Sequence, residues 1–437
     1  MPKDNPKPAE KEVDLFELYA DDPERADAIV FGRVANKDRR GFLKGAGLAT
    51  MGALIGAAIP FHRNMPSGFI PEALAAKQMD IAGKDGLRIV NDRPVNAECP
   101  AHLLDDEITP TSRHFIRNNG NPPENVDPAK WTVTVDGEVE KPMKLTIAEL
   151  KSKFEVVTTR LVVECAGNGR GFFNPPVKGG QWTVGAVGCA QWTGVRLADV
   201  LKAAGVKKNA VYTGHEGADT QLSGKPGLVL SRGAPIAKAM NPANLIAFAM
   251  NGADLHIMNG HPLRLVIPGW PGSCSQKWLT RVWVRDKVHD GPKMGGSAYR
   301  IPMYTVAPGQ KVPNKDYEIL GSHRVKSLIT TPESGAKLAL GQALDVRGHA
   351  WAGDNVVKAM HLSIDFGTTW IEANLQKPAN PFAWQRFSQR LQFPAAGYYE
   401  VWARATDDKG RMQPFAIAWN PKGYLNNAMH RVSVVVA

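Results

Sequence analysis

From about residue 325 to its end, the chain reads as short strands in which polar and apolar residues alternate. The segments are KLALGQALDVRGHAWAG, VVKAMHLSIDFGTTWIEANL, WQRFSQRLQF and GYYEVWARATDDKG, and Gly, Asp, Asn or Pro residues separate them. Strands that recur roughly every ten residues between turn residues are typical of an antiparallel β-sandwich. We therefore expect an Ig-like β-sandwich domain over residues 321–437.

The residues before this region mix strand and helix patterns and contain many Gly and Pro. WTVTVDG reads as an alternating strand and an Asp-Gly turn, and Thr146 and Glu149 have the spacing of a capping box. FEVVTTRLVVEC reads as a strand that ends at Cys165, and GVRLADVLKAAGV as an amphipathic helix that ends at Gly205. We expect an α+β domain of irregular topology over residues 76–320, with the join near residues 308–327.

Residues 1–75 have the organisation of an export signal. Paired arginines begin at Arg39 and precede the apolar run 46–60, and Ala73 and Ala75 form an A-x-A cleavage pattern. This order predicts a twin-arginine signal, preceded by a disordered polar stretch. A transmembrane helix is the weaker interpretation, because the run is short and rich in Gly and Ala. The twin-arginine route carries folded proteins, so we expect a periplasmic protein with a complex cofactor and no membrane span after processing.

The chain carries a net charge of +11. Such a surface would attract small anions or an acidic protein partner, or would serve solubility alone. Lys and Arg are scattered and no basic run alternates with aromatics, so nucleic acid is not an expected partner.

The four cysteines, at positions 99, 165, 189 and 274, could form two disulfides in an oxidising compartment. Their spacing matches no zinc, haem or iron–sulfur pattern. We interpret Cys99, Cys189 and Cys274 as small buried apolar residues. Cys165 differs, because RLVVECAGNGR places it at the end of an apolar strand, in a Gly-rich turn that leads to Arg170.

Several motifs, in this order, resemble the sulfite oxidase family of molybdenum-cofactor enzymes. They are the Cys-Ala-Gly-Asn turn, PVKGGQW, AQWTGVRLADVL, HPLRLVIPG and KWLTRV, followed by LSIDFGTTW and WNPKGYLNNAMHRV in the region of the family's dimerisation domain. The resemblance covers nearly all of residues 100–437. Together with the signal and the absence of a haem motif, it is strongest to the molybdenum subunits of periplasmic sulfane dehydrogenases. It implies a molybdopterin-binding domain, a dimerisation sandwich and a homodimer within a heterotetramer.

The resemblance also implies a role for individual residues. Cys165 would be the one protein thiolate on molybdenum, a soft metal centre. Arg170 would lower the pKa of that thiol and help to hold an anionic substrate. The implied catalytic residues are Arg117, Arg170, Trp182, Tyr299 and Arg431, with Tyr304 as an alternative to Tyr299. The implied cofactor-binding residues are Phe115, Ile116, Asn118, Asn119, Cys165, Asn259, Arg264, Ser275 and Lys277.

The chain departs from the family pattern at two positions. Asn119 and Asn259 stand where the family usually has histidine. An amide still forms hydrogen bonds but does not become charged near neutral pH. We expect molybdopterin binding to persist, but not the tuning of a sulfite oxidase site.

The resemblance implies an enzyme that oxidises reduced sulfur by oxygen transfer. Because the chain has no C-x-x-C-H motif, electrons would pass to a separate c-type cytochrome. The favoured substrate is a sulfane sulfur on a carrier protein, and free sulfite is the alternative. The two other possible functions are that of a structural subunit without active metal and that of a nitrate-reducing relative.

Overall fold

The computed structural model describes residues 80–437. The predicted export signal, and the polar stretch before it for which disorder is predicted, lie outside the described residues. The order of elements is α+β followed by a β-sandwich, so the predicted fold class is confirmed. Within residues 80–437 no helix has the length and apolarity needed to cross a membrane.

Two five-stranded sheets organise the part before residue 320. In the first sheet the order is β10–β9–β6–β5 and β11 pairs with β9; in the second it is β4–β3–β12–β7–β8. Every pairing is antiparallel except that of β12 with β3. The strands are β3 (Thr132–Gly137), β4 (Met143–Thr146), β5 (Val156–Glu164), β6 (Val187–Arg196), β7 (Tyr212–Gly217), β8 (Ser231–Pro235), β9 (Leu245–Met250), β10 (Ala253–Asp254), β11 (Arg264–Val266) and β12 (Leu279–Arg285).

Local sequence signals account for the two longer helices. At the start of α5 (Ile147–Lys153) the capping box is complete: Glu149 N donates to Thr146 Oγ1 over 3.1 Å, and Thr146 N to Glu149 Oε2 over 2.9 Å. Helix α6 (Leu197–Ala204) ends where Gly205 adopts a φ of 69°. Both predictions are confirmed, whereas the predicted Asp-Gly turn is wrong in detail, because β3 continues through Gly137.

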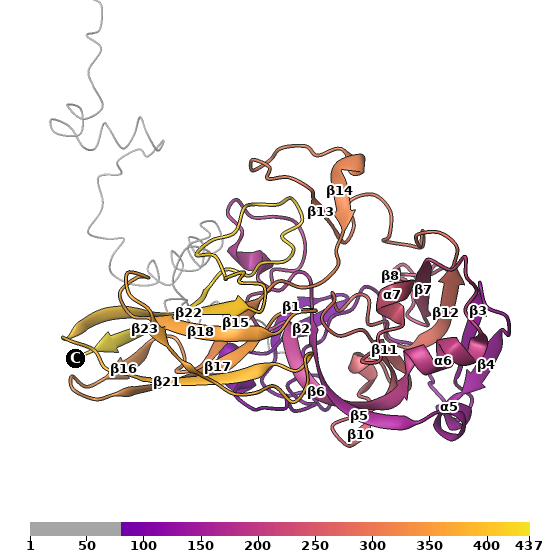
Figure 1. Ribbon diagram of the computed structural model, residues 1–437, viewed down its shortest axis with the longest axis horizontal. Helices are drawn as coiled ribbons and strands as arrows, with labels where there is room; N and C mark the ends of the chain where they lie inside the picture. Colours follow the sequence, from indigo (N-terminus) through magenta and orange to yellow (C-terminus); the bar gives the residue numbers. More distant parts are fainter. Residues whose placement is uncertain (1–79) are drawn as a thin grey trace, which may run out of the picture. The chain divides into compact units, whose positions relative to one another are not determined.

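The apolar face of α6 packs into the core of residues 80–320, the predicted catalytic part. Leu197, Val200 and Leu201 are fully buried in one cluster with Val133 of β3 and Val282 of β12. Short elements complete this part: α7 (Ile236–Ala239), β1 (Arg88–Asp92), β2 (Val95–Glu98), β13 (Arg300–Pro302), β14 (Tyr317–Ile319), and the 3-10 turns η3 (Ala101–Leu104), η4 (Arg170–Phe172), η5 (Ile257–Asn259) and η6 (Asn314–Asp316). Figure 1 shows α5 and α6 beside β3, β4 and β12.

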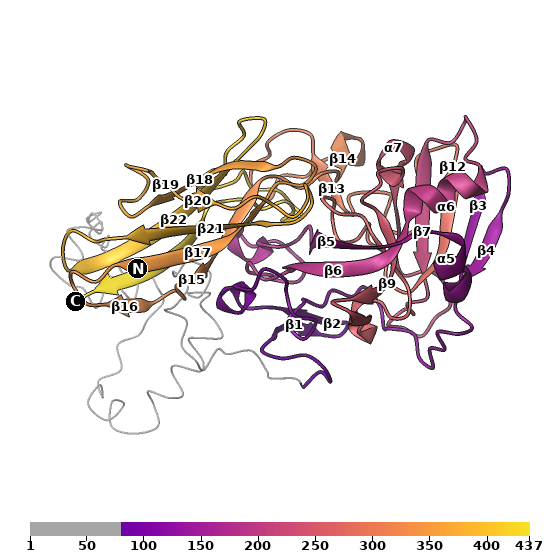
Figure 2. The same cartoon turned by 60° about the horizontal axis from the view of Figure 1, so that its bottom comes forward.

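The C-terminal residues form two sheets around their own core. One has the order β15–β17–β21–β20 and the other β16–β23–β22–β18–β19, and Figure 2 shows their strands stacked as a sandwich. The bounds are β15 (Lys326–Thr331), β16 (Ala336–Leu338), β17 (Leu344–Trp351), β18 (Val357–Ser363), β19 (Ile371–Glu372), β20 (Asn374–Leu375), β21 (Gln385–Leu391), β22 (Gly397–Asp407) and β23 (His430–Val436).

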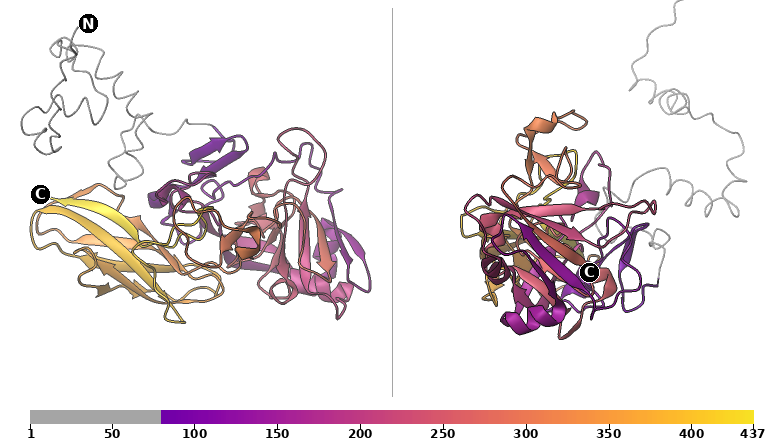
Figure 3. Two further views of the ribbon diagram at one scale, coloured as in Figure 1. Left: turned by 90° about the horizontal axis from the view of Figure 1, so that it is seen from above. Right: turned by 90° about the vertical axis from the view of Figure 1, so that its right-hand side faces the viewer.

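A mixed apolar cluster joins the catalytic part to the sandwich. Cys99 and Cys189 of the catalytic part are buried in it together with Leu328, Trp351 and Trp384 of the sandwich. Burial raises the pKa of both thiols to about 12. All four cysteines are buried and unbridged, so the interpretation of Cys99, Cys189 and Cys274 as buried apolar residues is confirmed. Figure 3 shows the sandwich strands and the catalytic sheets side by side.

Candidate functional site

A cavity whose empty space, together with the solvent at its mouth, amounts to about 660 Å³ lies in the catalytic part, next to the end of β5. Ten of the fourteen predicted site residues line it: Phe115, Arg117, Asn118, Asn119, Cys165, Asn259, Arg264, Ser275, Lys277 and Tyr299. They come from three separate stretches of sequence and from the single residues Cys165 and Tyr299. The fold thus brings together the motifs that the sequence singled out.

Cys165 follows β5 directly and reaches the cavity from the first residue of the turn. Its backbone N–H donates to Ala186 O over 2.9 Å, which continues the pairing of β5 with β6. The N–H of Gly167 lies 3.4 Å from Cys165 Sγ, and the residue is 8% exposed. Gly169 has a φ of 90°, so the turn needs glycine there. The sulfur is therefore held by regular backbone pairing at the wall of the cavity.

Arg117 is the cation that faces this thiol. Burial lowers its pKa, but Tyr299, Cys165 and Tyr424 close by favour the charged form and leave the pKa raised. The guanidinium carbon lies 5.9 Å from the centre of the Tyr299 ring. Its Nη1 atom is buried and has no hydrogen-bond partner. A buried, unpaired guanidinium N–H is costly unless a ligand accepts from it.

Three further basic side chains lie together at one side of the cavity: Arg264 and Lys277 line it, and Lys84 bonds to the lining residue Asn259. Arg264 donates to the carbonyls of Asn259 over 2.7 Å and Ser275 over 3.1 Å. Lys277 donates to Asn118 Oδ1 and Met258 O, and burial lowers its pKa well below the usual range, with Arg264 adding to the effect. Burial also lowers the pKa of Lys84 to about 7. Because these cations face carbonyls and amides rather than carboxylates, this side of the cavity suits an anion.

Lysines hold Asn119 and Asn259, the two asparagines at which a departure from the family pattern is expected from the sequence. Asn259 Oδ1 accepts from Lys84 Nζ over 2.5 Å, and its Nδ2 donates to Phe115 O over 3.1 Å. Asn119 Oδ1 accepts from Lys293 Nζ over 2.7 Å. Both amides are thus oriented by a cation, as neutral groups that cannot themselves gain a proton near pH 7.

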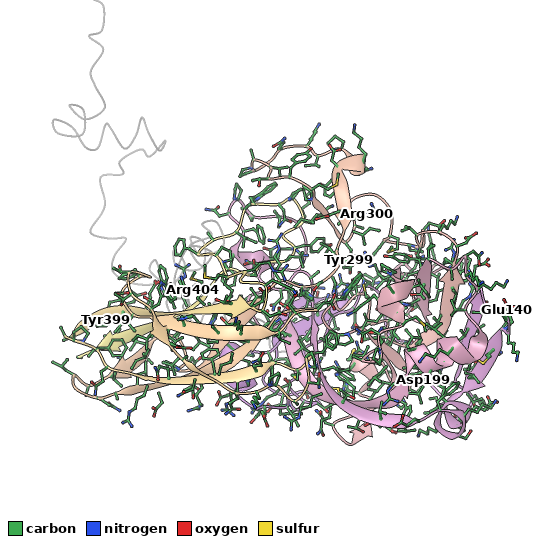
Figure 4. The ribbon with its side chains drawn as sticks, in the orientation of Figure 1. Glu140, Asp199, Tyr299, Arg300, Tyr399 and Arg404 are labelled. Atoms are coloured by element: carbon green, nitrogen blue, oxygen red, sulfur yellow. The ribbon has the colours of Figure 1, made fainter. Side chains whose placement is uncertain are left out.

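Tyr299, not Tyr304, is the cavity tyrosine. Tyr299 is 4% exposed, and its hydroxyl lies 3.4 Å from Asn119 Nδ2. Tyr304 is 46% exposed, and its hydroxyl donates to Asp316 over 3.0 Å. Figure 4 marks Tyr299 near the boundary between the catalytic sheets and the sandwich.

Four predicted residues lie away from the cavity. Ile116 is fully buried and pairs with Ala97 in a β-bridge. Trp182 is 2% exposed and packs in the apolar core cluster that contains Cys165. From the sequence, Trp182 is expected to line the cavity, but its side chain lies in the apolar core next to it.

The two remaining arginines are also placed differently from the prediction. Arg170 does not line the cavity: its Nε donates to Lys422 O over 2.9 Å and its Nη1 to Gly180 O over 3.0 Å. Arg431 lies on β23, pairs with Glu400 at 3.8 Å, and its guanidinium carbon is 5.1 Å from the centre of the Phe415 ring. Its strand directs it toward these side chains, so it does not reach the cavity.

The cavity also includes residues that the sequence did not single out. His114 and Gln276 are sequence neighbours of predicted residues, and that adjacency was the available signal. Asp219 carries no motif; burial raises its pKa despite the nearby Lys277. Five buried polar atoms of the lining have no partner among the described residues: His114 Nε2, Arg117 Nη1, Asp219 Oδ1, Ser273 Oγ and Gln276 Oε1. Native proteins satisfy nearly all such atoms, so these mark the site of a large polar ligand.

The cavity fits a pterin cofactor with an anionic tail and a soft metal. The unpaired donors and acceptors suit the polar edges of a pterin, and Arg264, Lys277 and Lys84 suit a phosphate. Cys165 offers one thiolate. Within residues 80–437 no group of three His, Cys, Asp or Glu residues could hold a metal ion unaided. A metal here would therefore depend on donors from the cofactor.

Comparison with known proteins also indicates a molybdopterin site. Residues 119–293 match the family described as oxidoreductase molybdopterin binding domain, and residues 318–437 match the Mo-co oxidoreductase dimerisation domain. The chain is 33% identical to sulfite oxidase of Gallus gallus over 79% of this chain and 77% of that protein. It is 34% identical to the mitochondrial enzyme of Rattus norvegicus, of which it spans 66%.

The chain is also similar to a nitrate reductase and to a solved structure of a sulfane dehydrogenase. Identity to a nitrate reductase of Hordeum vulgare is 29%, over 80% of this chain and 42% of that protein. The crystal structure of the sulfane dehydrogenase SoxCD from Paracoccus pantotrophus aligns with a TM-score of 0.65 at 24% identity, over 93% of this chain and 95% of that chain. That alignment shows a common fold.

Proposed function

This chain belongs to the sulfite oxidase family of molybdopterin-dependent oxidoreductases, and we propose that within the family it oxidises sulfane sulfur bound to a carrier protein. Free sulfite is the second candidate. The chain spans about two thirds of the length of its mitochondrial sulfite oxidase relatives, so substrate and partners are proposed from the site.

The observation that carries the proposal is the unpaired Nη1 atom of the Arg117 guanidinium beside Cys165. Arg117 Nη1 is buried without a partner at the cavity wall that also presents the thiol. A planar guanidinium binds oxygens of a sulfur oxyanion and would stabilise negative charge as it develops there. Tyr299 would add a hydroxyl donor, oriented by Asn119.

The remaining lining residues would hold the cofactor. When bound, molybdopterin supplies the oxygen-atom transfer and accepts two electrons. Cys165 would ligate the metal, while Arg264 and Lys277 would bind the anionic tail. The neutral histidine His114 stacks on Phe115, with ring centroids 5.1 Å apart, and its unpaired Nε2 would accept a hydrogen bond from the cofactor or donate one to it.

Two features favour carrier-bound sulfane over free sulfite. Asn119 and Asn259 stay uncharged where the family usually has histidine, so the site lacks two groups that would favour a free dianion. The fold likeness extends over almost the whole of a sulfane dehydrogenase. Sequence identity to sulfite oxidases is the observation that keeps sulfite as the second candidate.

The setting of the reaction is proposed on the same basis. The twin-arginine signal over residues 1–75 would deliver the folded chain to the periplasm. There a homodimer would form through residues 318–437, which match a dimerisation domain. Electrons would pass to a c-type cytochrome within a heterotetramer, and the charge of +11 would favour an acidic partner.

Direct competition tests the substrate. The mature chain and its cytochrome are offered carrier-bound sulfane or free sulfite, and cytochrome reduction is followed. We expect faster reduction with the carrier, and loss of it in Arg117→Met but not in Arg93→Met, whose guanidinium donates to Leu222 O at the surface. Reduction by sulfite with none from the carrier would overturn the sulfane assignment and leave the family and cofactor in place.

A further inference from the structure

The turn that carries Cys165 is bonded on its outer side to the sandwich. Leu425 N donates to Ala166 O over 2.9 Å. Asn426 Nδ2 donates to Gly169 O over 2.9 Å, and Lys326 Nζ lies 3.4 Å from Asn168 O. Three of the backbone carbonyls of this five-residue stretch therefore take a hydrogen bond from the C-terminal domain.

The other carbonyls of the turn are satisfied locally. Asn168 N donates to Cys165 O and Arg170 N donates to Gly167 O, each over 2.9 Å. Phe172 N adds a 3.2 Å contact to Gly169 O, where it shares the acceptor with Asn426. A buried carbonyl without a partner is costly, so the turn would relax if the sandwich withdrew its donors.

A buried carboxylate ties the residue before Cys165 to the same domain. Glu164 is 3% exposed, and its Oε1 accepts from Lys326 Nζ over 2.8 Å and from Asn168 Nδ2 over 3.0 Å. Its Oε2 accepts from Trp351 Nε1 over 2.7 Å. Lys326 and Trp351 belong to the sandwich, so the cysteine is held from both chain directions.

Gly169 of the cysteine turn and Gly423 of the sandwich have no side chain, so the cysteine turn and residues 420–427 can pack closely against each other. A Cβ on Gly169 would lie 2.8 Å from Asn426 Cβ, and a Cβ on Gly423 would lie 2.6 Å from Arg170 Cγ. Arg170 completes the contact through its bond to Lys422 O. This packing gives Arg170 a role in the junction, away from the cavity.

We propose that the C-terminal domain is a structural half of the metal site: residues 420–427 and Lys326 clamp the cysteine turn, and Asn426 is a positioning residue for Cys165 Sγ. The inference rests on the proposed assignment of Cys165 as the metal ligand. The position of a ligating atom decides its overlap with the metal, and residues that orient ligands affect metal sites strongly. A dimerisation domain thereby gains a second role, inside the active site.

The neighbouring asparagine provides a matched control. Asn427 Nδ2 donates to Val325 O over 3.1 Å, a bond inside the sandwich. Asn426 and Asn427 are 8% and 7% exposed. Asn426→Ala and Asn427→Ala therefore each remove one buried amide donor, but only the first removes a bond to the cysteine turn.

The test compares the two variants as complete proteins. Molybdenum content, the visible thiolate-to-metal absorption band and the Mo(V) electron paramagnetic resonance spectrum after chemical reduction are measured without substrate. We expect Asn426→Ala to retain molybdenum but to shift both spectra and to lower kcat about tenfold or more. Asn427→Ala should show wild-type spectra at a similar melting temperature. Equal spectra in the two variants would overturn the proposal.

Two further measurements keep the proposal testable. Asn426→Asp keeps the Oδ1 acceptor for Ala428 N, at 3.0 Å, but places a carboxylate oxygen against Gly169 O. If Asn426→Ala does not fold, Asn426→Asp must show the spectral shift. If wild-type protein binds no molybdenum, the proposed function is wrong, but the clamp can still be tested without metal. The rate of Cys165 alkylation, followed by mass spectrometry, must then still rise in Asn426→Ala relative to Asn427→Ala, or the clamp is wrong.

Discussion

Two buried polar networks meet at Cys165, and they differ in how completely they are paired. In the cavity, Arg117 and Gln276 carry buried polar atoms without partners, and cations outnumber the one lining carboxylate, Asp219. Behind the turn, Glu164 is 3% exposed, and each of its oxygens has a partner in Lys326, Asn168 or Trp351. An incomplete network marks a place for a ligand, while a complete one serves the fold.

The largest effect is expected at the residue that joins the two networks. Cys165→Ala should abolish turnover and sharply lower molybdenum content, because no other thiol lines the cavity and the Met258 thioether carries no negative charge. Cys189→Ala removes a fully buried thiol from the apolar cluster at the domain junction and should keep both turnover and molybdenum content. Metal analysis and turnover of the two purified variants check this. Full activity in Cys165→Ala would refute the ligand assignment.

Mutations in the paired network around Glu164 should lower the unfolding free energy of the protein. Lys326→Met leaves the Glu164 carboxylate buried without its cation, which costs about 3–5 kcal/mol of unfolding free energy. Lys153→Met breaks a surface pair with Glu149 and should lower the unfolding free energy far less. Chemical denaturation of both variants measures the contrast. Equal losses would mean that the Glu164 network contributes no more than a surface pair.

The sequence predicted what depends on local pattern. The Thr146–Glu149 box, the end of α6 at Gly205 and the strand leading to Cys165 follow from neighbouring residues. Arg431 and Trp182 were misplaced, because the face on which a strand or loop residue lies depends on packing against distant segments. Asp219 sits in no motif, and the bonds from Asn426 to the turn join residues 257 positions apart. Such contacts exist only once both domains are folded.

The unpaired network should gain stability when it loses charge. Burial lowers the pKa of Lys277 well below its usual range, with Arg264 contributing further, so its charged form is disfavoured in the folded chain. Lys277→Met should therefore raise the stability of the cofactor-free protein by on the order of 1 kcal/mol. The same variant should load less cofactor. Thermal unfolding with and without cofactor separates the two effects, and a destabilised cofactor-free variant would contradict the comparison.

The smallest effect concerns pH, and it also belongs to the unpaired network. Burial is the main cause that lowers the pKa of Lys84 from 10.5 to about 7 in the folded chain. Between these values the unfolded chain binds more protons than the folded one, so stability rises with pH. The penalty is fully present below about pH 7 and is relieved toward pH 10.5. The melting temperature of the cofactor-free protein, minus that of Lys84→Met, should therefore increase from pH 7 to pH 9. A bound anionic cofactor would stabilise the lysine's charge and flatten this difference. A difference that falls with pH would show that the folded chain stabilises the charge of Lys84 without a bound anion, which would contradict this prediction.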